Sequence, residues 1–209
     1  VVVLDSADNT TPVNLPLSGI LGELPRKRFE SDSPKQVLNA LVIPEGLTVH
    51  KALQMVLTLP GVSSKGYLVH KVDRSVTGLV ARQQCCGPSQ VPVADASVKA
   101  SSLFGLSGVV TAFGEQPNKV LISVTSGARM AVAEMLTNLA CVKISAIGDI
   151  KCRANWMWAA KRASEGSELY RAAVAMRDFM IGAGIAIDGG KDSLSMAADI
   201  DGEVAISPG

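Results

Sequence analysis

Residues 125–146 read TSGARMAVAEMLTNLACVKISA, and the interpretation of the whole chain starts from this stretch. Its alanine, methionine and leucine content favours an α-helix, with Thr125 or Ser126 as the N-cap. Glu134 and Asn138 are set four residues apart within it, and such residues lie on the same face of a helix. The stretch therefore predicts a long helix that carries a carboxylate and an amide side by side.

Two interpretations of Glu134 and Asn138 remain open at this point. Carboxylate and amide oxygens are hard ligands, which suit Mg²⁺ and the phosphates it carries better than they suit zinc. Polar pairs four residues apart are also ordinary on exposed helix faces. Spacing alone favours the exposed polar stripe, so the choice depends on the sequence around the pair.

The first part of the chain has the composition of a connector. Residues 1–35 mix Asp, Asn, Thr, Pro and Ser, which is typical of a segment that crosses a surface. Thr48 then offers the N-cap of a short amphipathic helix over residues 49–59, which Pro60 and Gly61 end. We therefore expect a linker at residues 1–47 and a folded domain at residues 48–209.

Strand patterns dominate the first half of the expected domain. Apolar and β-branched residues alternate between turn signals, whereas residues 149–158 are expected to be irregular. The predicted strands lie at residues 66–72, 75–83, 91–101 and 108–113.

Helix patterns dominate the second half. A second long helix is expected over residues 164–180, ended by Gly182 and Gly184. A short buried strand at residues 185–187 then opens into a glycine turn. Because strands come mostly first and long helices follow, we predict an α+β fold, with a mostly antiparallel sheet and two long helices on one face, rather than alternating βαβ units.

Length and composition indicate a globular protein that does not bind nucleic acid or membranes. With 209 residues, of which 47% are hydrophobic, the chain can bury one good core. A net charge of +1 leaves no basic surface for nucleic acid or anionic lipid. The four cysteines have no Cys-x-x-Cys spacing, which argues against structural zinc and suits a reducing, cytoplasmic location.

Four further segments are explained neither by propensity nor by a core pattern. They are residues 71–92 (KVDRSVTGLVARQQCCGPSQVP) with Val93-Ala94-Asp95, residues 114–117 (GEQP), residues 155–161 (NWMWAAK) and residues 188–196 (DGGKDSLSM). In this order they closely resemble the large formylglycinamide ribonucleotide amidotransferases, also called phosphoribosylformylglycinamidine synthases, of purine biosynthesis. The resemblance runs from about residue 21 to residue 209 and covers part of those enzymes only.

The resemblance implies a Mg-ADP site. Such a site needs anionic oxygens for the metal and a cation for phosphate. In the family, the positions of Lys65, Asp95, Glu134 and Asn138 match a nucleotide site in the second of two related domains. Asp95, Glu134 and Asn138 are therefore the expected metal ligands, and Lys65 is the expected phosphate ligand.

Lys191 and Ser193 complete the expected nucleotide-binding set on weaker grounds. Two glycines, a lysine and a serine after a strand can form a turn whose N–H groups face an anion. The spacing is not the Gly-x-x-x-x-Gly-Lys-Ser/Thr pattern. A plain glycine turn fits residues 188–193 equally well.

The resemblance also implies a function. The family uses ATP and glutamine to convert formylglycinamide ribonucleotide to formylglycinamidine ribonucleotide, and it duplicates a unit similar to aminoimidazole ribonucleotide synthetase. This chain is similar to the N-terminal half of the second copy with the linker before it. We expect bound Mg²⁺ with ADP or ATP as an auxiliary, structural ligand, and no catalytic residue.

The expected partners are other domains of one polypeptide: the first synthetase-like domain, the downstream C-terminal domain and a glutaminase domain. The chain lacks an initiator Met and stops after a strand-like run at residues 203–206, so we interpret it as an internal piece, inactive alone. Its exposed sheet is expected to favour homodimers. Two alternatives stay open, an assembly module without nucleotide and a kinase-like relative such as selenophosphate synthetase, although the segment at residues 155–161 argues against the latter.

Overall fold

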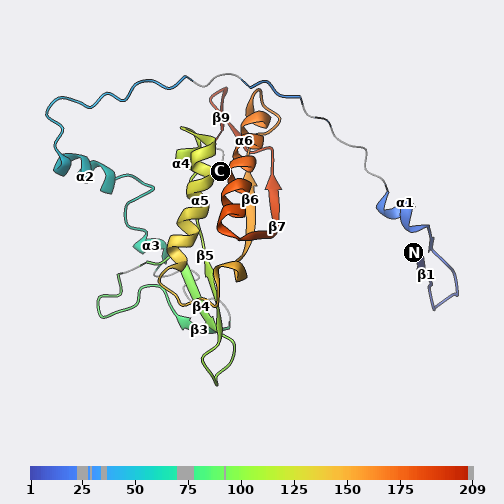
Figure 1. Cartoon of the computed structure of the whole chain (residues 1–209). Helices are drawn as coiled ribbons and strands as arrows, with labels where there is room; N and C mark the ends of the chain where they lie inside the picture. The colour runs from blue at the N-terminus through green and yellow to red at the C-terminus, as the bar shows by residue number, and fades with distance from the viewer. Residues whose placement is uncertain (23–27, 29, 34–36, 70–77, 92, 207–209) are drawn as a thin grey trace. The chain divides into compact units, whose positions relative to one another are not determined.

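The structure is a computed structural model that describes all residues except 23–27, 29, 34–36, 70–77, 92 and 207–209. The chain forms two compact units, Val1–Glu30 and Ser31–Gly209 (Figure 1). In the first unit, strands β1 (Val2–Val3) and β2 (Val13–Asn14) pair in an antiparallel hairpin, and helix α1 spans Leu17–Leu21. Every described residue of this unit except Val13 is exposed, so the unit has no apolar core of its own.

Two short helices open the second unit. Helix α2 (Val49–Leu57) begins as predicted, because the Thr48 hydroxyl accepts a hydrogen bond from the Lys51 N–H at 3.3 Å. Helix α3 (Gly66–Val69) occupies the start of a predicted strand. That prediction is wrong for residues 66–69, because the Ser64 hydroxyl and the Lys65 carbonyl accept local hydrogen bonds that start a helical turn. Residues 70–72 lie outside the described residues.

A three-stranded antiparallel sheet follows, with the strand order β3-β4-β5. Strand β3 spans Leu79–Arg82, β4 spans Ala96–Ala100 and β5 spans Gly108–Ala112. These strands confirm the centres of three predicted strands, although residues 75–77 and 92 are not described. No residue in the three strands is buried.

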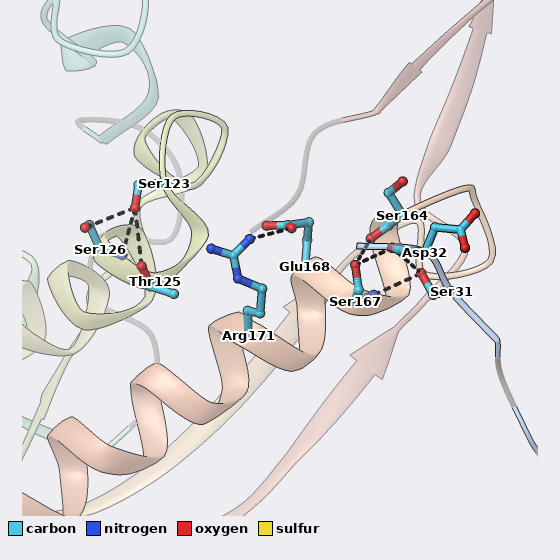
Figure 2. A network of polar contacts seen from close by, with 9 residues as sticks. All are labelled: Ser31, Asp32, Ser123, Thr125, Ser126, Ser164, Ser167, Glu168 and Arg171. Atoms are coloured by element: carbon cyan, nitrogen blue, oxygen red, sulfur yellow. Dashed lines mark hydrogen bonds and ion pairs between the residues drawn. The ribbon is translucent and has the colours of Figure 1, made fainter. Parts of the chain in front are cut away.

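The predicted long helix is present but shorter than expected. After the short helix α4 (Pro117–Val120), helix α5 spans Val124–Leu139 rather than residues 125–146. Its N-cap is Ser123, whose hydroxyl accepts from the Ser126 N–H at 3.3 Å (Figure 2), so the prediction of Thr125 or Ser126 is wrong. Val142 and Ile144 lie beyond the observed end, and β-branched residues lower helix propensity.

The C-terminal half contains a βαβ unit, which the sequence analysis did not predict. Strand β6 (Lys151–Met157) runs parallel to β7 (Ala186–Ser193), and helix α6 (Glu165–Ala183) connects them. Residues 151–157 are therefore a strand and not irregular, and residues 188–193 continue a strand instead of forming a turn. Gly184 ends α6 in the left-handed conformation, at φ 70°, as predicted. Gly182 was also expected to end the helix, and that prediction is wrong because the helix continues through it to Ala183.

The last element is a hairpin of β8 (Ala197–Ile200) and β9 (Glu203–Ile206). Asp201 and Gly202 form its turn at φ 53° and 85°, and two successive positive φ values are typical of a tight hairpin turn. The strand-like run at residues 203–206 is thus confirmed. No helix in the described ranges combines the length and apolar character needed to cross a membrane.

The core lies between α5 and α6, which run side by side (Figure 1). One cluster combines Val124 and Ala128 of α5 with Ala172 of α6 and with Trp158, which has no exposed surface. The predicted α+β class is confirmed. The strands of the described chain form four separate sheets, one of them parallel, instead of the single, mostly antiparallel sheet that was expected.

Candidate functional site

The loop of residues 113–116, which follows β5, lies directly against helix α5. A Cβ added at Gly114 would sit 2.2 Å from the carbonyl oxygen of Ala131 and 2.5 Å from the backbone nitrogen of Met135. Real Cβ atoms essentially never come within 3.0 Å of such atoms. Only glycine therefore fits between the 113–116 loop and the helix.

Glu134 fastens the 113–116 loop to the helix. Its Oε2 accepts hydrogen bonds from the Glu115 backbone N–H at 3.0 Å and from the Gln116 Nε2 at 2.7 Å. Hydrogen bonds to a carboxylate are stronger than those between neutral groups. Among the described residues, nothing donates to Oε1, so one oxygen of Glu134 holds the loop and the other is left for a further contact.

Asn138, one helical turn further along α5, holds the start of the same loop. Its Nδ2 donates to the Phe113 carbonyl at 2.7 Å. A carbonyl can only accept, so the amide presents its NH₂ group to Phe113 and its Oδ1 faces elsewhere. The Phe113 N–H in turn donates to the Asp95 carbonyl at 3.0 Å. Two hydrogen bonds through Phe113 therefore connect Asp95 with Asn138.

The structure thus gathers three of the predicted site residues, Asp95, Glu134 and Asn138, around the 113–116 loop. Asp95 is exposed, and the two α5 residues are half-buried. The Glu134 carboxylate and the Asn138 amide carry hard oxygen donors of the kind that Mg²⁺ prefers, whereas Asp95 contacts the loop through its backbone carbonyl. Within the described ranges, no group of three or more His, Cys, Asp or Glu residues is placed to hold a metal.

Sequence reasoning did not assign Gly114 or Gln116 to the site. Both belong to the GEQP segment, whose unusual composition was the available signal. The Glu115 backbone N–H holds the loop, while Glu115 itself is exposed.

Comparison with known proteins decides the family. The sequence model described as "FGAR-AT PurM_N-like domain" matches residues 64–208. This chain belongs to the FGAR-AT PurM_N-like domain family. The matched range includes the 113–116 loop and helices α5 and α6.

Curated proteins similar to this FGAR-AT PurM_N-like domain carry one name. It is 52% identical over 199 residues to the phosphoribosylformylglycinamidine synthase of Homo sapiens and 51% identical over 202 residues to that of Dictyostelium discoideum. A third such synthase, from Saccharomyces cerevisiae, is 38% identical over 211 residues. The alignments cover 95%, 93% and 99% of this chain but 15%, 15% and 16% of the relatives. The chain spans about 15% of their length, and the expected family resemblance is confirmed.

Lys65 of the FGAR-AT PurM_N-like domain lies in the turn before α3. Its Nζ donates to the carbonyl oxygens of Pro60 and Ser63, the latter at 2.7 Å. An ammonium group has three N–H donors, so one remains after these two bonds. Among the described residues, no hydrogen bond or ion pair joins Lys65 to the 113–116 loop.

Lys191 and Ser193 lie on strand β7 of the domain. The Lys191 Nζ donates to the Ser193 Oγ at 2.6 Å, as residues two apart on one face of a strand can do. Gly190 allows the close pairing with β6, because a Cβ there would sit 2.1 Å from the Ala154 carbonyl oxygen. Within the part of the chain that is described, no hydrogen bond connects these two residues to the 113–116 loop.

Proposed function

We propose that this domain is part of an ATP- and glutamine-dependent ligase that converts formylglycinamide ribonucleotide to formylglycinamidine ribonucleotide in purine biosynthesis. The names of the relatives support this proposal. Because the chain spans about 15% of those proteins, catalysis in this proposal belongs to other domains, and the isolated chain is inactive. The proposed location is the cytoplasm, although the plant relative is named as chloroplastic or mitochondrial.

In the proposal the domain binds Mg-ADP as an auxiliary ligand and does not turn it over. The observation that carries the site is the attachment of Asp95, Glu134 and Asn138 to one loop. Glu134 would bind the metal through Oε1 and Asn138 through Oδ1, which are the oxygens left over from loop binding. When bound, Mg²⁺ neutralises phosphate charge.

The phosphate side of the proposed site uses the cationic and hydroxyl groups. Lys65 would bind a phosphate oxygen with its remaining N–H donor. Lys191 and Ser193, which bond each other, would exchange that bond for phosphate contacts. Such contacts require Lys65 and strand β7 to approach the 113–116 loop when the other domains of the polypeptide are present.

We also propose that the β3-β4-β5 sheet pairs with another domain of the same polypeptide. None of its strand residues is buried, and a small sheet needs a covered apolar face to be stable. Leu103 and Phe104, in the connection between β4 and β5, are 80% and 87% exposed. Exposed apolar surface of this kind marks an interaction site, and without the other domains it would favour homodimers.

The second candidate is an assembly module that pairs with other domains and binds no nucleotide. One observation favours it, since Glu134 and Asn138 already have a structural role in holding the 113–116 loop. The two candidates differ in whether Glu134 Oε1 and Asn138 Oδ1 bind a metal.

Calorimetric titration of Mg-ADP into the chain separates the candidates. Glu134→Gln keeps an oxygen that can accept from Glu115 and Gln116 but removes the charge that a metal requires. Glu115→Gln is the matched control, because it removes a neighbouring exposed carboxylate. A Mg-ADP site predicts binding of about −8 kcal/mol, weakened at least about tenfold by Glu134→Gln and unchanged by Glu115→Gln. Binding that Glu134→Gln leaves intact excludes Glu134 as a ligand, and no heat with any variant favours the assembly module.

A further inference from the structure

Helix α6 has no local cap at its N-terminus. The first N–H groups of a helix have no partners inside the helix, and the residue before it commonly supplies a side-chain acceptor. Ser164 occupies that position, but its φ of 67° is left-handed and its side chain makes no capping hydrogen bond. The 19-residue helix therefore begins without the usual acceptor from its own sequence.

Ser31 supplies the acceptor from a distant part of the chain. The backbone N–H of Ser167, the third residue of α6, donates to the Ser31 Oγ at 3.1 Å across a separation of 136 residues (Figure 2). It shares this donor with the Ser164 carbonyl at 3.1 Å. A hydroxyl that accepts from the third N–H of a helix performs the role of an N-cap.

A second bond and a close packing contact hold the same segment. The Ser167 hydroxyl lies 2.7 Å from the Asp32 carbonyl oxygen and 2.8 Å from that of Ser164. Gly166 lies against Ser31, because a Cβ added there would be 3.2 Å from the Ser31 Cβ, 3.3 Å from its Oγ and 3.2 Å from the Ala160 carbonyl oxygen. The absence of a side chain at residue 166 thus lets the segment approach the helix.

We propose that Ser31 and Asp32 form a linker cap, a segment that docks on the first turn of α6 and replaces its missing N-cap. The docking site consists of Gly166, which provides room, and Ser167, which provides two donors. The cap attaches one part of the expected linker, residues 31 and 32, to the domain. Because its bonds are exposed to solvent, docking is an equilibrium that the loss of one hydroxyl measurably shifts.

Limited trypsin digestion of the 209-residue chain measures this equilibrium. Two cleavable bonds flank the linker cap in the sequence, after Arg28 and after Lys35, and a protease needs the chain around such a bond to be undocked. Initial cleavage rates at both bonds are followed by mass spectrometry. Ser31→Ala is expected to raise both rates about fivefold, which is the effect of losing a typical N-cap hydroxyl.

Three further variants make the outcome decisive. Ser33→Ala is the matched control and leaves both rates unchanged, whereas Ser31→Thr keeps a hydroxyl and keeps the protection. Gly166→Ala favours the helix by propensity but crowds Ser31, so it raises cleavage while helicity by circular dichroism is retained. Unchanged cleavage in Ser31→Ala or Gly166→Ala, or an equal rise in Ser33→Ala, overturns the proposal.

Discussion

Replacing Gly114 by alanine tests whether the 113–116 loop must lie flush on helix α5. The new Cβ would be 2.2 Å from the Ala131 carbonyl oxygen, whereas ordinary contact begins at 3.4 Å. Because the opposing atoms are helix backbone, the loop must move outward by roughly 1 Å. The hydrogen bonds from Glu115 and Gln116 to Glu134, at 3.0 and 2.7 Å, and the bond from Asn138, at 2.7 Å, would then exceed bonding distance.

The expected loss of unfolding free energy is about 2–4 kcal/mol. Bonds to an ionised carboxylate contribute roughly 1.5–3 kcal/mol each and a neutral bond about 1 kcal/mol, and partial solvent exposure reduces these values. Urea unfolding followed by circular dichroism measures the loss. Gly148→Ala is the matched control, because its Cβ would meet nothing nearer than 3.9 Å. A loss no larger in Gly114→Ala than in the control would refute this account of the loop.

Three further predictions concern the α6 half of the domain. Gly182→Ala should stabilise the chain by about 0.5–1 kcal/mol, because this helical position has open space and alanine has the higher helix propensity; a lower urea midpoint would contradict this. Burial raises the pKa of Glu165, and the charge of Glu168 acts in the same direction. Because folding therefore favours the protonated form of Glu165, its contribution to stability is present at low pH and is lost as pH rises through its folded-state pKa. Glu165→Gln should therefore unfold at a higher urea concentration than the parent at pH 7, by less than about 1 kcal/mol for a partly solvated group, with the gain shrinking by pH 4; a pH-independent gain would argue against it. Burial also raises the pKa of Cys152, helped by Asp188, so iodoacetamide at pH 8 should modify it about tenfold more slowly than the exposed Cys141, and equal rates by peptide mass spectrometry would exclude this.

The elements that sequence predicted correctly carry their own local signals. Thr48 supplies the hydroxyl that starts α2, and Gly184 adopts the left-handed conformation that ends α6. Strand β6 was missed although its exposure alternates along residues 151–157. The exposed face of β6 carries the polar residues Lys151, Arg153 and Asn155, so its apolar character is weak. Its partner strand, β7, follows only after helix α6 in the sequence.

The candidate site shows the same division between local and distant information. The spacing of Glu134 and Asn138 predicts that they share a helix face, but it cannot predict that a distant loop bonds to both. That arrangement depends on Gly114, which lies 20 residues before Glu134 in the sequence and contacts the helix backbone. Rules based on neighbouring residues also cannot predict the cap of α6, because Ser31 lies 136 residues from Ser167.

The central claim is that a metal–nucleotide complex binds beside the 113–116 loop, and paramagnetic NMR with Mn-ADP tests it most directly. Mn²⁺ accepts the oxygen ligands that Mg²⁺ uses and broadens the resonances of nearby amides. The account predicts that the amides of Asp95, Glu115 and Gln116 broaden first, and that Glu134→Gln raises the Mn-ADP concentration needed for this broadening at least about tenfold. Broadening centred elsewhere, or equal broadening in Glu134→Gln at the same Mn-ADP concentration, would contradict it.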